Sequence, residues 1–293
     1  MQTYCLQLSS PIRQERSIMH SLSQAEHDEF WRNGFLIKRS VFSEDELLQL
    51  RSHAERSKQH TGDFFCDEAF RNLITDTRLC HMAADLLGST PVYYGDCGVG
   101  INTKPGRWHK DNPHRYNKDL ADWKSRYPIV RFAIYLQDHA SSSGGLGIRR
   151  GSHMSATRYK GKPVYIDTRI GDVVMWHFRA THRATVSLMK GFNWPIHSQK
   201  VDKYLIPRFM KSPPSLDRLS VFITYGAEGP DLDRYIKYLA TRKASVERAK
   251  VTNYRNEWID AIDSSKLIFR DTTEEFQSMP ADRVHKKHRD FVE

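Results

Sequence analysis

Apolar residues in the first third of the chain recur at helical spacing, between short polar segments that can begin and end helices. Ser23 and Glu26 have the spacing of a capping box and predict the start of a short helix, which Gly34 ends. The run FLIKRSVF that follows alternates apolar and polar side chains, as a half-buried strand does. Residues 1–22, before this helix, predict only a loose N-terminal arm.

Two further helices are predicted before the chain changes character. Ser43 and Glu46 form a second capping box, and the leucines after it lie on one side of a helix that runs to about Gln59. A third helix is predicted over residues 76–87, where Gly88 stops it. Together these elements predict a helical layer at the N-terminal end of the fold.

From Val92 onward the apolar runs become short, β-branched and aromatic, with turn residues between them. Because the strands follow one another instead of alternating with helices, they indicate an antiparallel β core, in a mainly β fold with flanking helices. The composition after Asp231 is helical and highly charged, which predicts a C-terminal extension over residues 231–293. The predicted strands lie in VYYGDCGVGINTK, IVRFAIYLQD, VYIDTRIGDVVMWHF and RLSVFITYG.

Size and cysteine content limit the class of protein. A chain of 293 residues is long enough to bury a substantial core. Its four cysteines lie far apart without a CxxC pair, which argues against a disulfide framework or a thiolate zinc site and favours a reducing, cytoplasmic setting. No apolar run is long enough to cross a bilayer, and the first residues lack the apolar block of a secretory signal. No membrane partner is therefore expected.

The chain is basic, with 45 lysines and arginines against 35 aspartates and glutamates and a formal net charge of +10. Such an excess can attract nucleic acid, acidic membranes or a small anionic substrate. The basic residues are scattered, however, and have acids nearby, as in KDLADWKSRY and TRKASVERAK. A mixed, solvated surface is the preferred interpretation, and nucleic-acid binding is the least favoured.

The segment GRWHKDNPHRY holds the densest group of candidate ligands. In an extended segment the side chains of His109 and Asp111, two positions apart, leave the same face. They could form a hydrogen-bonded pair, or two of the three ligands of a metal site. Two histidines and a carboxylate on one face of Fe(II) leave positions open for a cosubstrate and dioxygen.

The third ligand is expected from a later strand of the same core. The segment GDVVMWHFRATHRA offers His177 and His182, whose separation of five puts them on opposite faces of a regular strand. Only one of them is therefore expected to be a ligand. His182, near a strand end, is the favoured ligand, and His177 is the alternative. His153 stands in a Gly-Ser turn, where a structural role is expected.

A cation at the start of the last predicted strand suits an acidic cosubstrate. Arg218 leads into RLSVFITYG, and a guanidinium can bind a carboxylate through two parallel hydrogen bonds. The alternative is a surface arginine paired with Asp217. Asn102 ends an earlier strand, seven residues before His109, and either faces the cosubstrate or caps a turn.

The order of WHKD, VRFAIYLQDHASSSGGLGIRRGSHM, GDVVMWHFRATH and a strand-opening arginine resembles the phytanoyl-CoA dioxygenase family of Fe(II)- and 2-oxoglutarate-dependent oxygenases, over roughly residues 23–227. The resemblance implies a double-stranded β-helix (jelly-roll) core. It also implies that His109, Asp111 and His182 hold iron, and that Arg218 grips the distal carboxylate of 2-oxoglutarate.

The chain departs from the family's pattern in the spacing of its arginine. Arg218 follows His182 by 36 positions, much farther than is usual in the family, so an insertion is expected at about residues 184–216. Arg183 and Arg208 are the alternative carboxylate-binding arginines, although neither opens a β run.

A second departure concerns the small hydroxyl residue that the family often has two places after the second histidine. Ala184 stands there in this chain, and Thr185 is the expected substitute in cosubstrate binding. The insertion that follows is rich in aromatic residues, cations and prolines. It is expected to be a substrate lid, with a surface excursion or a dimer contact as alternatives.

These features predict an oxygenase domain over residues 23–230 that uses Fe(II), 2-oxoglutarate and O2 and releases succinate and CO2. Halogenating relatives replace the carboxylate ligand, so the presence of Asp111 favours hydroxylation, desaturation or ring closure. Lys110, His114 and Arg115 add positive charge beside the metal motif and indicate a polar or anionic metabolite or natural-product intermediate as substrate. The alternative is a non-catalytic jelly-roll binding or scaffold protein. A homo-oligomer is compatible with either.

Overall fold

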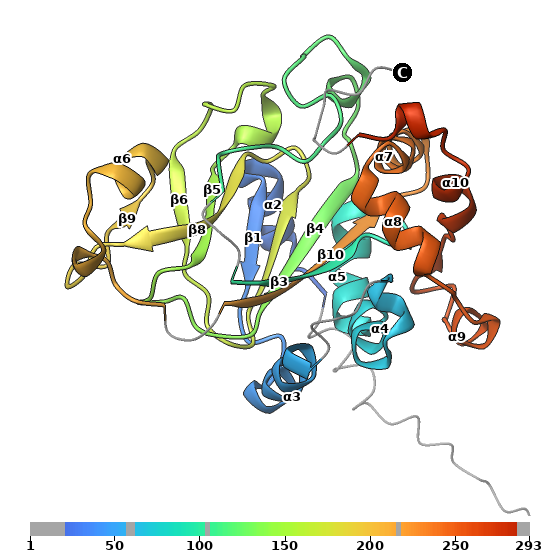
Figure 1. Ribbon diagram of the computed structural model, residues 1–293, viewed down its shortest axis with the longest axis horizontal. Coiled ribbons are helices and arrows are strands. Elements are labelled where there is room, and N and C mark those ends of the chain that lie inside the picture. The colour runs from blue at the N-terminus through green and yellow to red at the C-terminus, as the bar shows by residue number, and fades with distance from the viewer. Residues whose placement is uncertain (1–20, 57–61, 103–105, 215–217, 286–293) are drawn as a thin grey trace, which may run out of the picture.

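Two β-sheets face each other at the centre of the molecule, with helices at the outside (Figure 1). The computed structural model describes residues 21–56, 62–102, 106–214 and 218–285. Most of the predicted N-terminal arm and the predicted helix end near Gln59 lie outside these residues.

The larger sheet has the strand order β1-β7-β4-β10-β2-β11, and β3 pairs with β10 beside this path. Its pairings are antiparallel except for that of β11 with β2. The long register of β10 against β4 sets Thr224 opposite Arg131. The strands are β1 (Phe35–Lys38), β2 (Val92–Tyr93), β3 (Cys97–Ile101), β4 (Ile129–Tyr135), β7 (Val173–His177), β10 (Leu219–Gly226) and β11 (Ile268–Phe269).

The smaller sheet has the order β6-β5-β8-β9 and covers the inner face of the larger one. Side chains of both sheets meet in a buried layer that includes Tyr135, Trp176, Leu146 and Ile148. Alternation along β4 therefore sends Arg131 and the positions two and four residues after it toward the smaller sheet. The strands are β5 (Gly145–Arg149), β6 (Pro163–Ile166), β8 (His182–Leu188) and β9 (Pro195–Ile196).

The predicted N-terminal helices are confirmed and cover the outer face of the larger sheet. Ser23 and Glu26 form the capping box of the first, and Gly34 ends it in the left-handed conformation. Asp76 caps the third, which Gly88 ends in the same way. Outward-facing apolar residues of β4, β7 and β10 bury against this layer. The helices are α2 (Gln24–Asn33), α3 (Glu44–Arg56), α4 (Glu68–Ile74) and α5 (Thr77–Leu87).

The C-terminal segment is part of the same body. Helix α7 packs through Leu232, Tyr235 and Ile236 on Val92 and Phe178, which belong to the β core. Strand β11 extends the larger sheet at its β2 edge. Figure 1 shows these helices at one end of the molecule and α6 (Gln199–Tyr204) at the other. The C-terminal helices are α7 (Pro230–Ala240), α8 (Lys243–Val251), α9 (Asn256–Asp260) and α10 (Thr273–Gln277).

Two boundaries differ from those predicted. The segment that carries the two candidate histidines is not one strand, because β7 ends at His177 and β8 begins at His182 after a turn. Strand β8 then continues to Leu188, so the excursion from the core begins after that residue rather than at Ala184. The turn between β7 and β8 carries the chain from the larger sheet to the smaller one, and β8 continues to Leu188 because it pairs there with β5 and β9.

Among the described residues, no helix is long and apolar enough to cross a membrane. Three of the cysteines, Cys66, Cys80 and Cys97, are free thiols in the described part of the chain. Their distances along the chain had already argued against a disulfide framework.

Candidate metal centre

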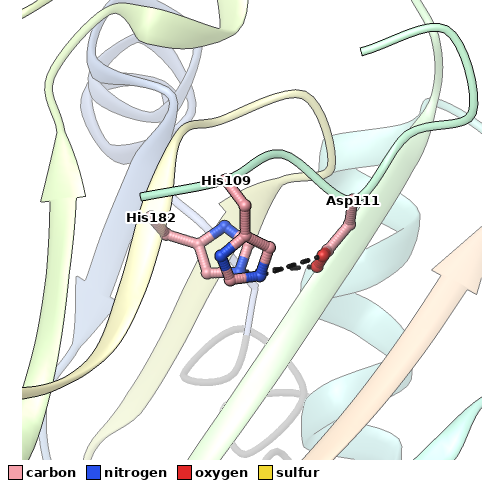
Figure 2. A group of neighbouring side chains, drawn as sticks. All are labelled: His109, Asp111 and His182. Atoms are coloured by element: carbon pink, nitrogen blue, oxygen red, sulfur yellow. Dashed lines mark ion pairs between the residues drawn. The ribbon is translucent and has the colours of Figure 1, made fainter. Parts of the chain in front are cut away.

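His109 and His182 lie side by side because their backbones pair. The amide of each donates to the carbonyl of the other, at 3.0 Å and 2.9 Å, so the segment before Asp111 runs antiparallel to the start of β8. The two imidazole rings have centroids 4.4 Å apart and point to the same side (Figure 2).

Asp111 completes the group from the next inward position of its segment (Figure 2). One carboxylate oxygen lies 3.4 Å from Nε2 of His109, and the other lies 3.5 Å from Nε2 of His182. The three candidate ligand atoms all lie within 4.8 Å of one another. His182, the predicted third partner, therefore lies beside His109 and Asp111, and the three side chains converge.

Hydrogen bonds to the backbone orient both imidazoles. Nδ1 of His109 lies 2.8 Å from the carbonyl oxygen of Arg107, and Nδ1 of His182 lies 3.1 Å from that of Ala180. A carbonyl oxygen only accepts, so each Nδ1 carries the proton. Each neutral ring then presents the lone pair of Nε2 to the space shared with Asp111, as metal-binding histidines do.

The charge of the group suits a cation. Burial alone would raise the pKa of Asp111, but His182, Arg131 and His109 together hold it well below its usual value, so the carboxylate is ionised. Burial lowers the pKa of His182 to about 4, which keeps this ring neutral. For His109 burial acts downward, but its interaction with Asp111 raises the pKa overall. The group thus offers a neutral imidazole at His182 and an ionised carboxylate at Asp111, while the proton that Asp111 favours on His109 is one that a bound cation would displace.

Arg131 supports the carboxylate from the inner face of β4. Its guanidinium donates to Asp111 at 3.2 Å and to Asp96 at 2.7 Å, and its Nε donates to Thr224 at 3.0 Å. Tyr235 of helix α7 donates to the same Asp96 at 3.1 Å. The arginine therefore fixes one oxygen of Asp111 while the other oxygen stays directed at His109. An arginine inside the run IVRFAIY was the sequence signal for this role, and it was missed.

The cations beside the metal motif are structural. Lys110 is fully buried, and its ammonium donates to the carbonyls of Ser152 and Arg179, both at 2.8 Å. His114 and Arg115 are also buried, and Arg115 donates to the Tyr238 hydroxyl of helix α7. They lie inside the protein and not on a substrate surface, so the charge argument from these three residues for an anionic substrate is not sustained.

Arg218 lies at the start of β10, among polar groups between the sheets. It is 4% exposed, and its guanidinium donates to the Gly144 carbonyl at 2.8 Å and to the Ser220 hydroxyl at 3.2 Å. The guanidinium lies 5.4 Å from the ring of Tyr135, whose buried hydroxyl interacts with it. Burial raises the pKa of Tyr135, so the phenol keeps its proton. Tyr135 was not predicted, although it ends the same alternating run as Arg131.

Asn102 holds the backbone of Arg218. Its side-chain oxygen accepts from the Arg218 amide at 2.8 Å, and its own amide donates to the Arg218 carbonyl at 2.8 Å. Thr185 is half-buried in β8 and has a left-handed backbone (φ 58°), where the register against β5 shifts. The structure thus brings Asn102 to Arg218, whereas Thr185 marks an irregularity in the strand.

The alternative residues lie elsewhere. His177 points to the helical layer, where its Nε2 lies 3.1 Å from the Arg126 carbonyl and its ring stacks edge-on with Trp31. Arg183 faces away from the metal group and pairs with Asp202 at 3.3 Å. Arg208 is exposed on the insertion.

The insertion covers the outer face of the smaller sheet. Strand β9 pairs with the end of β8, and the His197 carbonyl then accepts from Trp108 and Arg183, both at 3.0 Å. Trp108 points opposite to His109 in the same extended segment. The aromatic residues expected to line a lid are exposed: Phe192, Trp194, Tyr204 and Phe209.

Buried neutral histidines make the fold sensitive to acid. Burial lowers the pKa of His139 to about 3 and that of His153 to about 4, and it holds that of His177 well below 6.5. Below pH 6.5 the unfolded chain gains protons that the folded chain does not. The free energy of unfolding therefore decreases by about 1.4 kcal/mol for each histidine and each unit by which the pH is lowered.

We expect urea unfolding of the chelator-treated protein at pH 7 and pH 5.5 to show this loss. His139→Gln should reduce the pH dependence by about one histidine's share; an unchanged slope would contradict it.

Asp122 ties the segment after the metal motif to helix α7. Its fully buried carboxylate accepts from the side chain of Asn112 at 2.8 Å, from the His114 amide at 2.9 Å and from Arg234 at 2.7 Å. Arg234 also pairs with Asp231 in the same helix. The C-terminal helix therefore holds the loop that carries Asp111.

Asp122→Ala is expected to lower the free energy of unfolding by about 3 kcal/mol, because it removes the acceptor of two buried donors and of a buried cation. Urea unfolding measures the loss. The matched variant Asp122→Asn keeps an acceptor oxygen and should lose less. Equal stability of the alanine variant and the wild type would show that the loop is held by other contacts.

The fold of the chain is similar to those of several solved structures. No family model and no curated protein matches the sequence. EctD from S. alaskensis with bound Fe is similar over 72% of this chain and 80% of its own, with a TM-score of 0.52 and 16% identity. EctD with 2-oxoglutarate and 5-hydroxyectoine is similar over 70% and 76%, with a TM-score of 0.51 and 16% identity. SnoK, a non-heme alpha ketoglutarate dependent carbocyclase from nogalamycin biosynthesis, is similar over 70% and 84%, with a TM-score of 0.50 and 17% identity.

At these identities the likeness concerns the fold. The chain has the double-stranded β-helix fold of phytanoyl-CoA dioxygenase-like oxygenases, with two facing sheets and flanking helices. The predicted fold class is confirmed, and the predicted resemblance is confirmed as a likeness of fold. The His109–Asp111–His182 group lies between the two sheets of that fold.

Proposed function

We propose that the protein is an Fe(II)- and 2-oxoglutarate-dependent oxygenase. The observation that carries the proposal is the convergence of His109, Asp111 and His182 on one space, with candidate ligand atoms within 4.8 Å of one another. Two histidines and one carboxylate on one face are the donor set of non-haem Fe(II) oxygenases. The resemblance of the ordered motifs to such enzymes and the fold support the same activity.

The residues present fit this metal. His109 and His182 would bind through Nε2, since their Nδ1 atoms are engaged by backbone carbonyls. Asp111 would bind through one oxygen, while Arg131 holds the other at 3.2 Å. The ion pair with Arg131 fixes the carboxylate before any metal arrives, which lowers the entropic cost of ligation.

We infer that Arg218 and Tyr135 bind the distal carboxylate of 2-oxoglutarate. Both groups are buried between the sheets, and Ser220 on the same inward face adds a hydroxyl. A guanidinium with a phenolic donor beside it offers charge-assisted hydrogen bonds to a carboxylate in a low-dielectric interior. Asn102 would act through the placement of Arg218, whose backbone it holds. Thr185, half-buried in β8, remains a proposed contributor to cosubstrate binding.

Iron and 2-oxoglutarate, when bound, would supply the activation of dioxygen, with one oxygen atom going to the succinate that forms with CO2 and the other to oxidation of the substrate. The chain's own part is placement. Arg131 keeps Asp111 ionised and fixed, Arg218 anchors the diacid, and the apolar layer around Trp176 excludes water from the space between them. With Asp111 present, hydroxylation, desaturation or ring closure is proposed in preference to halogenation.

The proposed substrate is a small polar or anionic metabolite or natural-product intermediate. EctD was solved with 5-hydroxyectoine, and SnoK is a carbocyclase of nogalamycin biosynthesis, so this fold accepts small molecules of different kinds. We also propose that residues 231–293 brace the oxygenase domain of residues 23–230, because Tyr235 and Arg234 hold the acids that fix the metal loop.

The direct test combines turnover with binding. Purified protein is incubated with Fe(II), 2-oxoglutarate and oxygen, and succinate is measured; binding of 2-oxoglutarate is measured in parallel under nitrogen, since enzymes of this kind turn over slowly without their substrate. Succinate formation that depends on iron supports the proposal. Metal binding without 2-oxoglutarate binding would favour the non-catalytic jelly-roll protein. Failure to bind either would contradict both the metal site and the oxygenase.

A further inference from the structure

A cavity of about 710 Å³ lies outside the metal centre, between the insertion and the outer face of the smaller sheet. Its walls come from the segment before His109, from the end of β5 and the loop after it, and from the stretch through helix α6. None of the three candidate metal ligands lines it. Figure 1 shows α6 at the end of the molecule opposite the C-terminal helices.

The walls of this cavity carry only positive charge. No acidic residue lines it, and none of its five cations forms an ion pair with any residue in the described ranges. Asp202, the acid of α6, is buried and pairs with Arg183 and Lys211 instead. Cations gathered in one concave place repel one another, and an anion bound among them relieves this repulsion. The five are Arg107, Arg149, Arg158, Lys200 and Lys203.

One wall is preformed. Trp108 donates to the His197 carbonyl at 3.0 Å, and the guanidinium of Arg149 stacks over its indole at 4.8 Å. A side chain at Gly147 would come within 2.8 Å of Val186 and 3.1 Å of Trp108, so glycine lets the indole lie against the sheet.

The guanidinium of Arg149 is fixed by backbone carbonyls and still has N–H groups that can donate to a ligand. It donates through one terminal nitrogen to the carbonyls of Tyr159 and Gly161, at 3.3 Å and 2.9 Å. Its Nε is buried and has no hydrogen-bond partner among the described residues. A guanidinium fixed in this way offers its remaining N–H groups to an anion at little entropic cost.

Two exposed tyrosines also line the cavity. Tyr159 and Tyr204 line the cavity and are 68% and 71% exposed. Lys203 lies over the Tyr204 ring at 4.8 Å, and Arg158 lies over the Tyr159 ring at 5.0 Å. Aromatic rings next to unpaired cations offer a face for a planar group and charges for the anion attached to it.

We propose that this cavity binds a small molecule that carries phosphate groups. Five cations that have no acidic partner among the described residues exceed what a single carboxylate requires, and both the arginine fork and the lysine point charge suit phosphate oxygens. The site stands apart from the proposed oxygenase activity, because it shares no residue with the metal group. It adjoins that group along the chain, since the carbonyl of Arg107 accepts from Nδ1 of His109.

Binding of ADP and of inorganic pyrophosphate is measured by calorimetry at low ionic strength. The double variant Lys200→Glu/Lys203→Glu is compared with Lys237→Glu/Lys250→Glu, which makes the same change in net charge on the exposed faces of α7 and α8. We expect the wild type to bind, the first double variant to bind at least about tenfold more weakly, and the second to bind as the wild type does. Thermal unfolding checks that both variants fold.

Two arms separate the sources of the phosphate. Tighter binding of ADP than of pyrophosphate assigns the site to a nucleoside phosphate or a similar planar molecule, and equal binding assigns it to the phosphate alone. Binding that persists in His109→Ala separates this site from the metal centre. Absence of binding, equal weakening by both double variants, or much tighter binding of a short single-stranded DNA than of ADP would each overturn the proposal.

Discussion

His109→Ala, Asp111→Ala and His182→Ala should each weaken iron binding by more than about 100-fold and reduce succinate formation to background. Loss of an outer partner of a metal ligand already costs about 10- to 100-fold in affinity, and loss of a ligand itself costs more. Iron binding is measured by competition with a chromophoric chelator, and succinate by chromatography. Because all three candidate ligand atoms lie within 4.8 Å of one another, the three variants should fail together.

Two controls separate loss of the metal from loss of the fold. Asp111→Asn keeps a hydrogen-bond acceptor for Arg131 but removes the charge, so it should fold while still binding iron poorly. His81→Ala removes a half-buried histidine of helix α5, outside the metal group, and should bind iron as the wild type does. Normal iron affinity in any two of the three ligand variants would refute the metal centre.

Arg218→Ala should weaken 2-oxoglutarate binding by roughly 30- to 1000-fold, or about 2–4 kcal/mol, and leave iron binding intact. The guanidinium of Arg218 is a buried cation between the sheets that can pair with a second carboxylate, and an alanine leaves that carboxylate without its charged partner. Arg218→Lys keeps the charge but not the fork, so it should recover only part of the affinity. Tyr135→Phe should cost roughly 5- to 10-fold, the value of one hydrogen bond.

The two alternative carboxylate-binding arginines, Arg183 and Arg208, provide control variants for Arg218→Ala. Arg208→Ala changes an exposed residue, and Arg183→Ala changes a fully buried one that pairs with Asp202 on the outer side of the smaller sheet. Arg183→Ala is expected to destabilise the fold because it leaves Asp202 with one cation fewer, so thermal unfolding must show that the variant is folded. Neither variant, when folded, should alter the affinity for 2-oxoglutarate by more than about twofold. If Arg183→Ala or Arg208→Ala abolished binding while Arg218→Ala did not, the cosubstrate would lie in another part of the molecule.

Local signals in the sequence were enough for the helices and for the convergence of His109 with Asp111. A capping box at Ser23 and an αL glycine at Gly34 depend on a few neighbouring residues, so they could be read directly. The two-residue spacing of His109 and Asp111 likewise reports a shared face. His182 does lie at a strand end, as predicted, but it and His177 belong to strands of different sheets, which the sequence pattern did not indicate.

What the sequence could not show depends on burial and on distant contacts. Lys110 and Arg115 stand next to the metal motif and suggested a charged substrate surface, but both are buried against carbonyl and hydroxyl oxygens of distant segments. Arg131 and Tyr135 became visible only when β4 was paired and its inner face identified. The insertion suggested a lid, whereas the bonds of Trp108 and Arg183 to His197 hold it against the outside of the smaller sheet.

The parallel pairing of β11 with β2 joins residues about 175 positions apart, and Asp122 and Arg234 join the metal loop to the same late segment. During translation, the candidate ligands are synthesised well before the late residues that hold the loop after Asp111. The contacts that Arg234 makes with Asp122 therefore form only when translation is nearly finished. Cleavage just before α7 is expected to remove them, so the last fifth of the chain decides how firmly the loop after Asp111 is held.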